Sequence, residues 1–429
     1  MLKALNGNVI IDYLNSSAVL SSGQGTAGKG GNIRIEAADR IAINSVNTSS
    51  SGPGRGGNLE LMGSQVELPT RSDSVQINLG DFILEPTTSS TNVFLSSSND
   101  VPGNLTLTSE EIGFLNSNFE SITIGRSDGT GTVFMDNMTY SAPLTVRSPD
   151  GSIVINGAIV VNNNAALTLE GPTILNGNIT ADSAPITIIG NTTLGSNPIT
   201  LTSQDGTITL EGSINGEPSL TLEAGSGNIN ITGVIGGVTP VGNVMANSTG
   251  TTRFGDSITA ASLTTNAGGT TELNGNVTTT GAIGQVYGDR VTTSANVTLS
   301  TVNSANGSIV INGGIEADTN ASLTLEGSTI LKGDITTSNA PLTITGDLTL
   351  DSNPITLMSK DGTITVEGSI NGEPSLTLEA GSGNINITGV MGGVTPMGNL
   401  TVNTTGTTRF GDSITAASLT TNAGGTTEL

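Results

Sequence analysis

One long stretch of this chain occurs twice. The segment EGSINGEPSLTLEAGSGNINITGV begins at Glu211 and again, letter for letter, at Glu367, an offset of 156 residues (367 − 211). The match extends without a gap from 151–273 onto 307–429, with 97 of the 123 aligned positions identical. Repeats this long and regular are typical of folds whose units stack on one another, so stacking is expected here in preference to separate globules.

The composition agrees with a thin core. Hydrophobic residues make up 34% of the chain and aromatic residues 2%, and Trp, His and Cys are absent, so large rings cannot fill a thick globular core. The Ile, Leu and Val residues alternate with polar ones, which fits a narrow apolar column along an axis. Disorder is the competing interpretation of so polar a chain, but disordered segments lack ordered alternation of β-branched residues.

Short apolar pairs recur at a nearly constant distance from Gly151 onward. They are Leu167 with Leu169, Ile186 with Ile188, Ile208 with Leu210, and Ile229 with Ile231. Their starts lie 19, 22 and 21 residues apart, with turn signals such as Asn176-Gly177 and Asp205-Gly206 between them. The spacing predicts an elongated all-β solenoid with roughly 20 residues per rung, about 20 rungs and a length of order 100 Å. An antiparallel sandwich is the alternative, because Asn-Gly and Asp-Gly turns also close hairpins.

Four segments are predicted. Residues 1–69 form Gly-, Ser- and Asn-rich β-helical rungs, 70–150 an irregular β-helical segment containing Phe, 151–306 the first long repeat and 307–429 the second, truncated repeat. In the first segment the phrases GKGGNIRI from Gly28 and GRGGNLEL from Gly54 lie 26 residues apart and suggest equivalent positions on two rungs.

Five of the seven Phe residues fall in the second segment, which also predicts one short helical turn near residues 110–115. They are Phe82, Phe94, Phe114, Phe119 and Phe134. A locally thicker core and a binding pocket built from these rings are both open.

Several phrases occur together in the chain: SLTLEAGSGNINITGVIGGVTPVGN, GTTRFGDSITAASLTTNAGGTTELNGNVTTTGA, ESITIGRSDGTGTV and GKGGNIRIEAADRIAI. They resemble the body of bacterial filamentous-haemagglutinin-like exoproteins, notably the cyanobacterial ones, over most of the chain. The resemblance implies a right-handed parallel β-helix, export by a partner outer-membrane transporter in the two-partner manner, and a role in surface attachment or aggregation. A secretion domain of that family is not recognisable near Met1, and the second repeat stops at Leu429 where the first continues, so we expect a fragment of a longer protein.

The net charge of −23 argues against nucleic acid and anionic lipid surfaces as partners. The sequence contains no run of about 18 apolar residues, so it predicts no membrane-spanning helix. The opening residues MLKALNGNVIIDYLNSS break their apolar run at Asn6 and Asp12, so they do not form a signal peptide, and an export signal is expected upstream of Met1. The chain contains no Cys and so forms no disulfide, but this does not indicate in which compartment the protein works.

Catalytic chemistry finds little support in the sequence. The stretch GQGTAGKG from Gly23 lacks the Ser or Thr after Lys29 that a phosphate-binding loop needs, so it predicts a glycine turn. Acidic residues are spread one or two per rung without His and with few Arg, which predicts a solvated outer face; examples are Asp205, Glu211, Glu217, Glu223 and Asp256. We predict no catalytic, cofactor-binding or metal-binding residue. A surface ion pair is expected between Arg253 and Asp256, repeated as Arg409 and Asp412.

The sequence gives little indication of a calcium site or of an ice-binding face. No D-x-D-x-D-G loop or GGxGxDxUx nonapeptide is present, so no dedicated calcium cage is predicted, although diffuse, weak calcium binding stays open. The T-x-T triplets, such as Thr207-Ile208-Thr209, would bind ice only as a flat array in register, and the uneven spacing argues against such an array.

The sequence therefore favours a non-catalytic, structural or adhesive exoprotein segment, extracellular or on the outer cell surface, that mediates attachment or aggregation. Its expected partners are the two-partner transporter and a host or neighbouring cell surface or glycan. The alternatives are a polysaccharide-active enzyme on a β-helix scaffold and a passive stalk that presents another domain.

Overall fold

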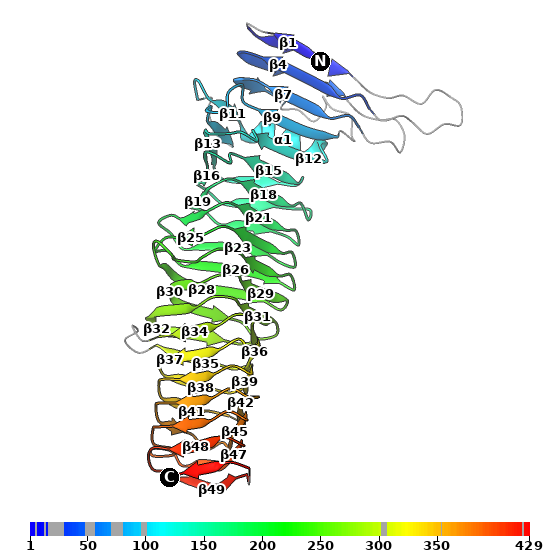
Figure 1. The fold of residues 1–429 in the computed structure, drawn as a ribbon. Coiled ribbons are helices and arrows are strands. Elements are labelled where there is room, and N and C mark those ends of the chain that lie inside the picture. The colour runs from blue at the N-terminus through cyan, green and yellow to red at the C-terminus, as the bar shows by residue number, and fades with distance from the viewer. Residues whose placement is uncertain are drawn as a thin grey trace, which may run out of the picture. The chain divides into compact units, whose positions relative to one another are not determined.

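The computed structural model describes residues 1–429 except 5–6, 13, 16–29, 48–55, 70–79, 96–100, 302–306, 353 and 423. It is a parallel β-solenoid of about 17 turns with about 22 residues per turn (Figure 1). The predicted solenoid is confirmed, with turns slightly longer than the 20 residues expected. Every described strand pair with an assigned register is parallel, which excludes the antiparallel sandwich for those strands.

Alternation of side chains explains why each strand needs its neighbours. In β18 (Leu167–Glu170) the side chains of Leu167 and Leu169 are buried while Thr168 is partly exposed. Leu167 lies in register with Ile186 of the following turn. Because successive parallel strands lie about 4.8 Å apart, like residues stack over like and share an apolar column that no single turn encloses.

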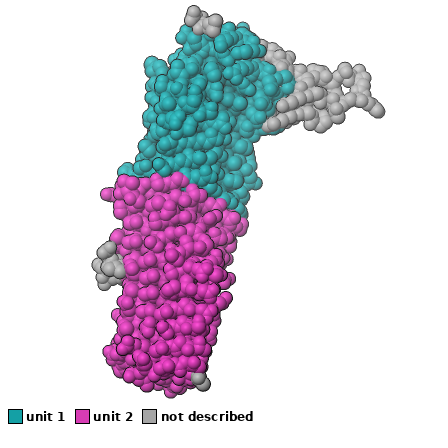
Figure 2. Space-filling model, viewed as in Figure 1, with its two compact units in different colours: residues 1–211 teal, residues 212–429 magenta. Residues whose placement is uncertain are grey.

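The chain divides into two compact units, residues 1–211 and 212–429, coloured teal and magenta in Figure 2. The strands of the first unit are β1 (Leu2–Ala4), β2 (Val9–Ile11), β3 (Leu14–Asn15), β4 (Ile33–Ala37), β5 (Arg40–Ile43), β6 (Val46–Asn47), β7 (Leu59–Met62), β8 (Gln65–Glu67), β9 (Asp81–Glu85), β10 (Val93–Leu95), β11 (Leu105–Leu107), β12 (Ser121–Gly125), β13 (Thr132–Met135), β14 (Met138–Tyr140), β15 (Leu144–Arg147), β16 (Ser152–Ile155), β17 (Ile159–Val161), β18 (Leu167–Glu170), β19 (Thr173–Leu175), β20 (Ile179–Ala181), β21 (Ile186–Ile189), β22 (Thr192–Leu194), β23 (Ile199–Ser203) and β24 (Ile208–Glu211).

The strands of the second unit are β25 (Ile214–Asn215), β26 (Leu220–Gly225), β27 (Ile229–Ile231), β28 (Val241–Ser248), β29 (Thr251–Phe254), β30 (Ile258–Thr265), β31 (Thr270–Leu273), β32 (Val277–Tyr287), β33 (Arg290–Thr293), β34 (Val297–Ser300), β35 (Ser308–Ile311), β36 (Ile315–Thr319), β37 (Leu323–Glu326), β38 (Thr329–Leu331), β39 (Ile335–Ser338), β40 (Leu342–Ile344), β41 (Leu348–Leu350), β42 (Ile355–Ser359), β43 (Ile364–Val366), β44 (Ile370–Asn371), β45 (Leu376–Gly381), β46 (Ile385–Ile387), β47 (Met397–Thr404), β48 (Thr407–Phe410), β49 (Ala416–Thr421) and β50 (Thr426–Glu428).

Within the first unit, three strands of each later turn pair with their counterparts in the next. One ladder runs β9, β12, β15, β18, β21 and β24, a second β10, β13, β16, β19 and β22, and a third β14, β17, β20 and β23. In the earlier turns Ile33 pairs with Leu59 and Ile35 with Leu61, which confirms that GGNIRI and GGNLEL occupy equivalent positions on adjacent rungs. Gly28, Lys29, Gly54 and Arg55 lie outside the described residues.

One turn of the first unit is interrupted by an α-helix. Helix α1 (Ser109–Asn118) begins with a capping box, in which the Thr108 hydroxyl accepts a hydrogen bond from the Glu111 backbone and the Glu111 carboxylate accepts one from the Thr108 backbone. Glu111 also accepts a hydrogen bond from the backbone N–H of Leu68, at 2.7 Å. The predicted helical turn near residues 110–115 is confirmed and is longer than expected.

The phenylalanines divide into two groups. Phe82, Phe114 and Phe119 are buried and contact one another through their rings, with centroid distances of 5.1 Å for Phe82–Phe119 and 6.3 Å for Phe114–Phe119. These three rings therefore pack on one another in the core beside α1. Phe94 and Phe134 instead stack on each other at 4.7 Å from partly exposed positions of adjacent strands.

In the second unit the strands β28, β30 and β32 follow one another in a ladder and are long, with 8, 8 and 11 residues. Their ladder shifts register between Ala260 and Ser262, so the extra residues of β32 form a bulge. Inside this part of the core the Tyr287 hydroxyl donates to the Gln285 amide oxygen at 2.9 Å, and the Gln285 amide nitrogen donates to two backbone carbonyls. Burial of these polar groups is therefore compensated by hydrogen bonds.

Candidate functional site

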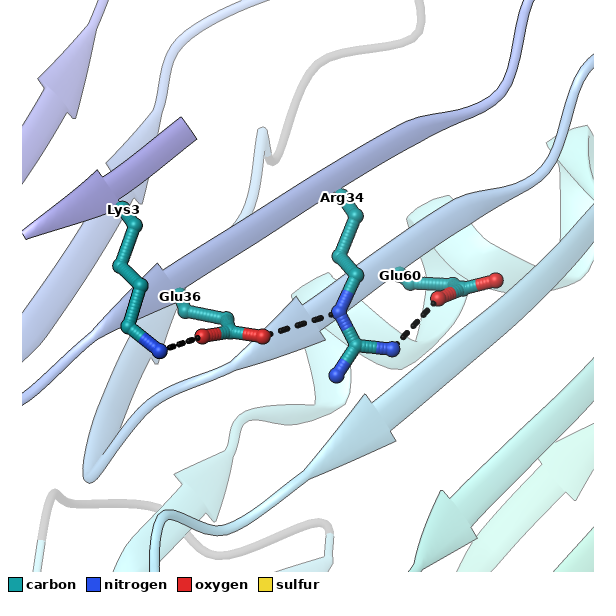
Figure 3. A network of polar contacts seen from close by, with 4 residues as sticks. All are labelled: Lys3, Arg34, Glu36 and Glu60. Atoms are coloured by element: carbon teal, nitrogen blue, oxygen red, sulfur yellow. Dashed lines mark hydrogen bonds and ion pairs between the residues drawn. The ribbon is translucent and has the colours of Figure 1, made fainter. Parts of the chain in front are cut away.

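Charged side chains form a chain of contacts across the first turns of the first unit (Figure 3). Lys3 Nζ lies 2.6 Å from Glu36 Oε2, Arg34 Nε 3.0 Å from Glu36 Oε1, and Arg34 Nη1 3.1 Å from Glu60 Oε2. Lys3 and then Arg34 hold the pKa of Glu36 below its ordinary value, while hydrogen bonds to Glu36 and Glu60 raise the pKa of Arg34. These exposed pairs align adjacent turns and each contributes little to stability.

A small hollow of about 120 Å³ lies beside this charged network. It is lined by Arg34, Glu60, Leu61, Met62, Ile83 and Glu85. The guanidinium of Arg34 is already paired with two carboxylates, so its charge is compensated within the chain. The Arg34 charge in this hollow is therefore not free to bind an anionic ligand.

Ion pairs between turns recur in the second unit, but not with the predicted partner. Arg253 Nε lies 3.8 Å from Glu272 Oε2 of the next turn, and its duplicate Arg409 lies 3.7 Å from Glu428. The carboxylate of Asp256 instead accepts a hydrogen bond from the backbone N–H of Ser257, at 2.7 Å. The prediction of an Arg253–Asp256 pair is therefore wrong, because residues in register on adjacent strands face each other while Asp256 lies beyond the end of its strand.

The other acidic residues considered for catalysis lie on the outside of the solenoid. Asp205, Glu211, Glu217 and Asp256 are exposed and Glu223 is partly exposed. Glu211, Glu217 and Glu223 follow one another along strands β24 to β26, and the described residues contain no group of three His, Cys, Asp or Glu side chains that could hold a metal ion. The sequence interpretation of these acids as outer-face charge agrees with their positions.

A second hollow, of about 450 Å³, lies between α1 and strands β14 and β17. Its lining is Ser109, Ile112, Gly113, Asn137, Met138, Thr139, Ala158 and Val160. Asn116 fixes the helix against β14, because its amide donates to the Thr139 carbonyl at 2.7 Å and accepts from the Ser141 N–H at 3.3 Å. None of the lining side chains titrates, so the hollow has no group for acid–base catalysis.

Asp289 is a buried acid that sequence reasoning did not single out. It follows β32, is 5% exposed, and its Oδ1 accepts hydrogen bonds from the hydroxyls of Thr265 at 3.1 Å and Thr271 at 2.8 Å. Burial raises its pKa, and the two hydroxyl donors oppose this shift without cancelling it. The next residue, Arg290, is exposed and pairs with Glu316.

Replacing Asp289 with Asn should therefore raise stability at neutral pH by about 1 kcal/mol, since the amide oxygen keeps both hydroxyl contacts and carries no charge. A carboxyl whose pKa is raised on folding favours the folded state below its unfolded pKa, near 3.9, and this contribution is lost as pH rises through the folded pKa. The advantage of the variant should thus grow from pH 4 to pH 8. Thermal unfolding followed by circular dichroism measures it, and a constant difference across this range would contradict the argument.

Outward-facing threonines stack in register in the first unit. The column comprises Thr123, Thr145, Thr168, Thr187 and Thr209. The expectation that uneven spacing prevents such alignment is wrong, because the extra residues lie in the corners and leave the strands in register. The column is one threonine wide: Arg147 and Glu170, which pair at 2.8 Å, lie on one side of it.

One surface loop is built identically in both repeats. In the first copy, the Asn215 side-chain oxygen accepts hydrogen bonds from the N–H groups of Val238 at 2.8 Å and Thr239 at 3.2 Å. In the second copy, Asn371 holds Val394 and Thr395 at 2.9 and 3.3 Å. The valine side chains at the two tips are 87% and 86% exposed. A fixed backbone thus presents an apolar side chain to solvent twice.

No family model, no curated protein and no solved structure matches the chain.

In the described residues, no helix has the length and hydropathy needed to cross a bilayer. The glycine-rich stretch from Gly23 lies largely outside the described residues, so its interpretation as a simple turn stays a prediction. The repeated loop around Val238 and Val394 is the feature of the described surface that an adhesive role would use most directly.

Proposed function

We propose that this chain is a non-catalytic segment of an exported, surface-displayed exoprotein of the filamentous-haemagglutinin-like kind, which attaches cells to a glycan or to a neighbouring cell surface. The observation that carries the proposal is the duplicated loop, in which Asn215 and Asn371 hold an exposed valine in the same backbone setting. Export through a two-partner outer-membrane transporter is part of the proposal and rests on the sequence resemblance.

Repetition is what makes a weak surface contact useful. A single exposed valine contributes little binding energy, but two identical contacts on one chain act together when the target is itself repetitive, as a polysaccharide or a cell surface is. The preformed loop adds to this, because a backbone already fixed by the asparagine side chain loses little conformational entropy on binding. A duplicated, rigid and apolar display loop fits attachment better than turnover.

The enzymatic alternative needs a carboxylate pair beside a substrate groove. The larger hollow is lined by neutral side chains, and none of the acids named above lines it. The passive-stalk alternative needs no ligand at all, and the exposure of Val238 and Val394 favours attachment over it.

The proposal is tested by binding of the purified chain to intact bacterial cells and to immobilised polysaccharides. Replacing both loop valines, V238D with V394D, should weaken binding at least tenfold because both apolar contacts become charged. The matched control is T209D with T365D, which adds the same charge at equivalent, partly exposed positions of the two repeats.

The other outcomes separate the alternatives. Equal binding by the two double variants would contradict a role for the loop. Release of sugar fragments from a polysaccharide by the wild-type chain would contradict the non-catalytic proposal. A folded chain that binds none of the surfaces would favour the passive stalk.

A further inference from the structure

An apolar column runs along the outside of the first unit. It consists of Phe94, Phe134, Val154 and Ile174, which lie in register on the successive strands β10, β13, β16 and β19. Each is partly exposed and alternates with buried neighbours on its own strand, so each faces outward. Elsewhere this chain mostly places Thr, Asn or charged residues at such positions, as in the threonine column. Four consecutive apolar side chains at outward positions therefore stand out.

The second unit repeats the column. Val286, Val310 and Ile330 lie in register on β32, β35 and β38, and all three face outward and are partly exposed. Val310 and Ile330 are the duplicates of Val154 and Ile174, at the same offset of 156 residues. Each unit thus has its own outward apolar column, called here the apolar ladder.

The borders of the apolar ladder carry few charges. On one side Thr132 and Ser152 contact each other through their hydroxyls at 3.1 Å. On the other side Asp136 is held by the amide of Asn156 at 3.3 Å. In the second unit the flanking Lys332 pairs with Asp351 at 3.1 Å, which leaves those two charges compensated.

The scarcity of charge indicates which partner fits. With a net charge of −23, two copies of this chain repel each other over most of their surface. A basic partner would be drawn to the acidic surface and gain nothing from an apolar column. A second copy can approach closely only through a face where like charges are scarce and apolar area becomes buried, and the apolar ladder is such a face.

We propose that the apolar ladder is a lateral docking surface for a second copy of the same chain. The inference rests on the proposed function of a surface-displayed segment and deepens it. It adds self-association as a second contact, separate from attachment through the Val238 loop. In a two-fold symmetric contact, the same column on both partners meets itself, so Phe134 of one copy would lie beside Val154 of the other. Each unit carries one such column, so each chain offers two docking surfaces.

The first test is sedimentation velocity of the purified chain as a function of concentration. Wild type should form dimers or larger assemblies, and association should strengthen when NaCl is raised from about 0.05 to about 0.5 M, because salt screens the repulsion between copies. V154E with V310E should weaken association at least tenfold. T168E with T324E is the control: it adds the same two charges at equivalent outward positions of a different ladder and should leave association unchanged.

A second test does not depend on the glutamate variants folding. The chain contains no Cys, so V154C introduces a single thiol. Mild oxidation or a short bis-maleimide should link V154C chains into covalent dimers, whereas T168C chains should stay unlinked. Val154 and Thr168 are both partly exposed, so the difference reports proximity between copies rather than thiol access.

The outcomes are decisive in both directions. A wild-type chain that stays monomeric up to about 100 μM at all salt concentrations overturns the inference, as does equal cross-linking of V154C and T168C. The folded V154E/V310E variant also separates the two proposals. If it is monomeric yet still binds cells or polysaccharide through the loop valines, both stand; if it is monomeric and wild type binds no surface, the attachment proposal alone fails.

Discussion

Replacing Ile208 with Asp is expected to destabilise the solenoid by about 4 kcal/mol or more. Ile208 is fully buried in β24, where it lies in register with Ile186 of the neighbouring turn. The substitution removes apolar contacts on that column and places a carboxylate where no described cation faces it, and an uncompensated buried charge costs several kcal/mol. The free energy of unfolding, measured by urea titration with far-UV circular dichroism, reports the loss.

Thr209 supplies the control because it is the next residue on the same strand and faces outward. Thr209→Asp should change stability by less than about 1 kcal/mol, since the new charge stays hydrated. The repeat provides an internal replicate: Ile364, also fully buried, should respond like Ile208, and Thr365 like Thr209. Comparable losses at 208 and 209 would mean that the two side chains do not face opposite sides of the strand.

The contrast between Ile208 and Thr209 also shows what the sequence predicts well. Alternation along a strand is a local property set by the backbone, so the inward and outward positions follow from the letters alone. The duplication then predicts stacking, because equal letters at the offset of 156 residues form the same series of turns twice. These two patterns suffice for the parallel solenoid and for the buried columns of Ile and Leu.

Register between turns was harder to predict. The sequence distances from Leu167 to Ile186 and from Ile186 to Ile208 differ by three residues, yet all three side chains lie in one column. Corners absorb the difference, and corner length is not encoded in the alternation. For the same reason the threonine column was not expected from the sequence.

The candidate surfaces were missed because an apolar residue is ordinarily expected inside. Val154 lies in Ile153-Val154-Ile155, where the outer two residues are buried, so the middle one must face outward. A run of three apolar residues in a strand was the available signal. For Val238 the signal was two glycines before it and a proline after Thr239, which end the alternation and form a loop.

Gly236→Ala is the second substitution with a large expected effect, about 3 kcal/mol, and it acts on the loop that carries Val238. Gly236 has φ +71°, a left-handed conformation that costs other residues about 1–2 kcal/mol. An added Cβ would also lie 2.0 Å from the Thr259 carbonyl oxygen of the next turn, so the backbone must move. That movement disturbs the hydrogen bond from Gly236 N–H to the Ile214 carbonyl, at 2.7 Å.

Gly103 separates the two contributions. Its φ is +79°, but a Cβ there meets no atom within 4 Å, so Gly103→Ala should cost only about 1 kcal/mol through backbone strain. Gly392 has a φ of +69°, close to that of Gly236, and an added Cβ would lie 2.0 Å from the Thr415 carbonyl oxygen. Gly392→Ala should therefore cost as much as Gly236→Ala. Urea unfolding measures all three. Equal losses of stability for Gly103→Ala and Gly236→Ala would mean that close packing of the loop on the next turn does not fix the exposed valine. The attachment proposal, which depends on a rigid loop, would then lose its physical basis.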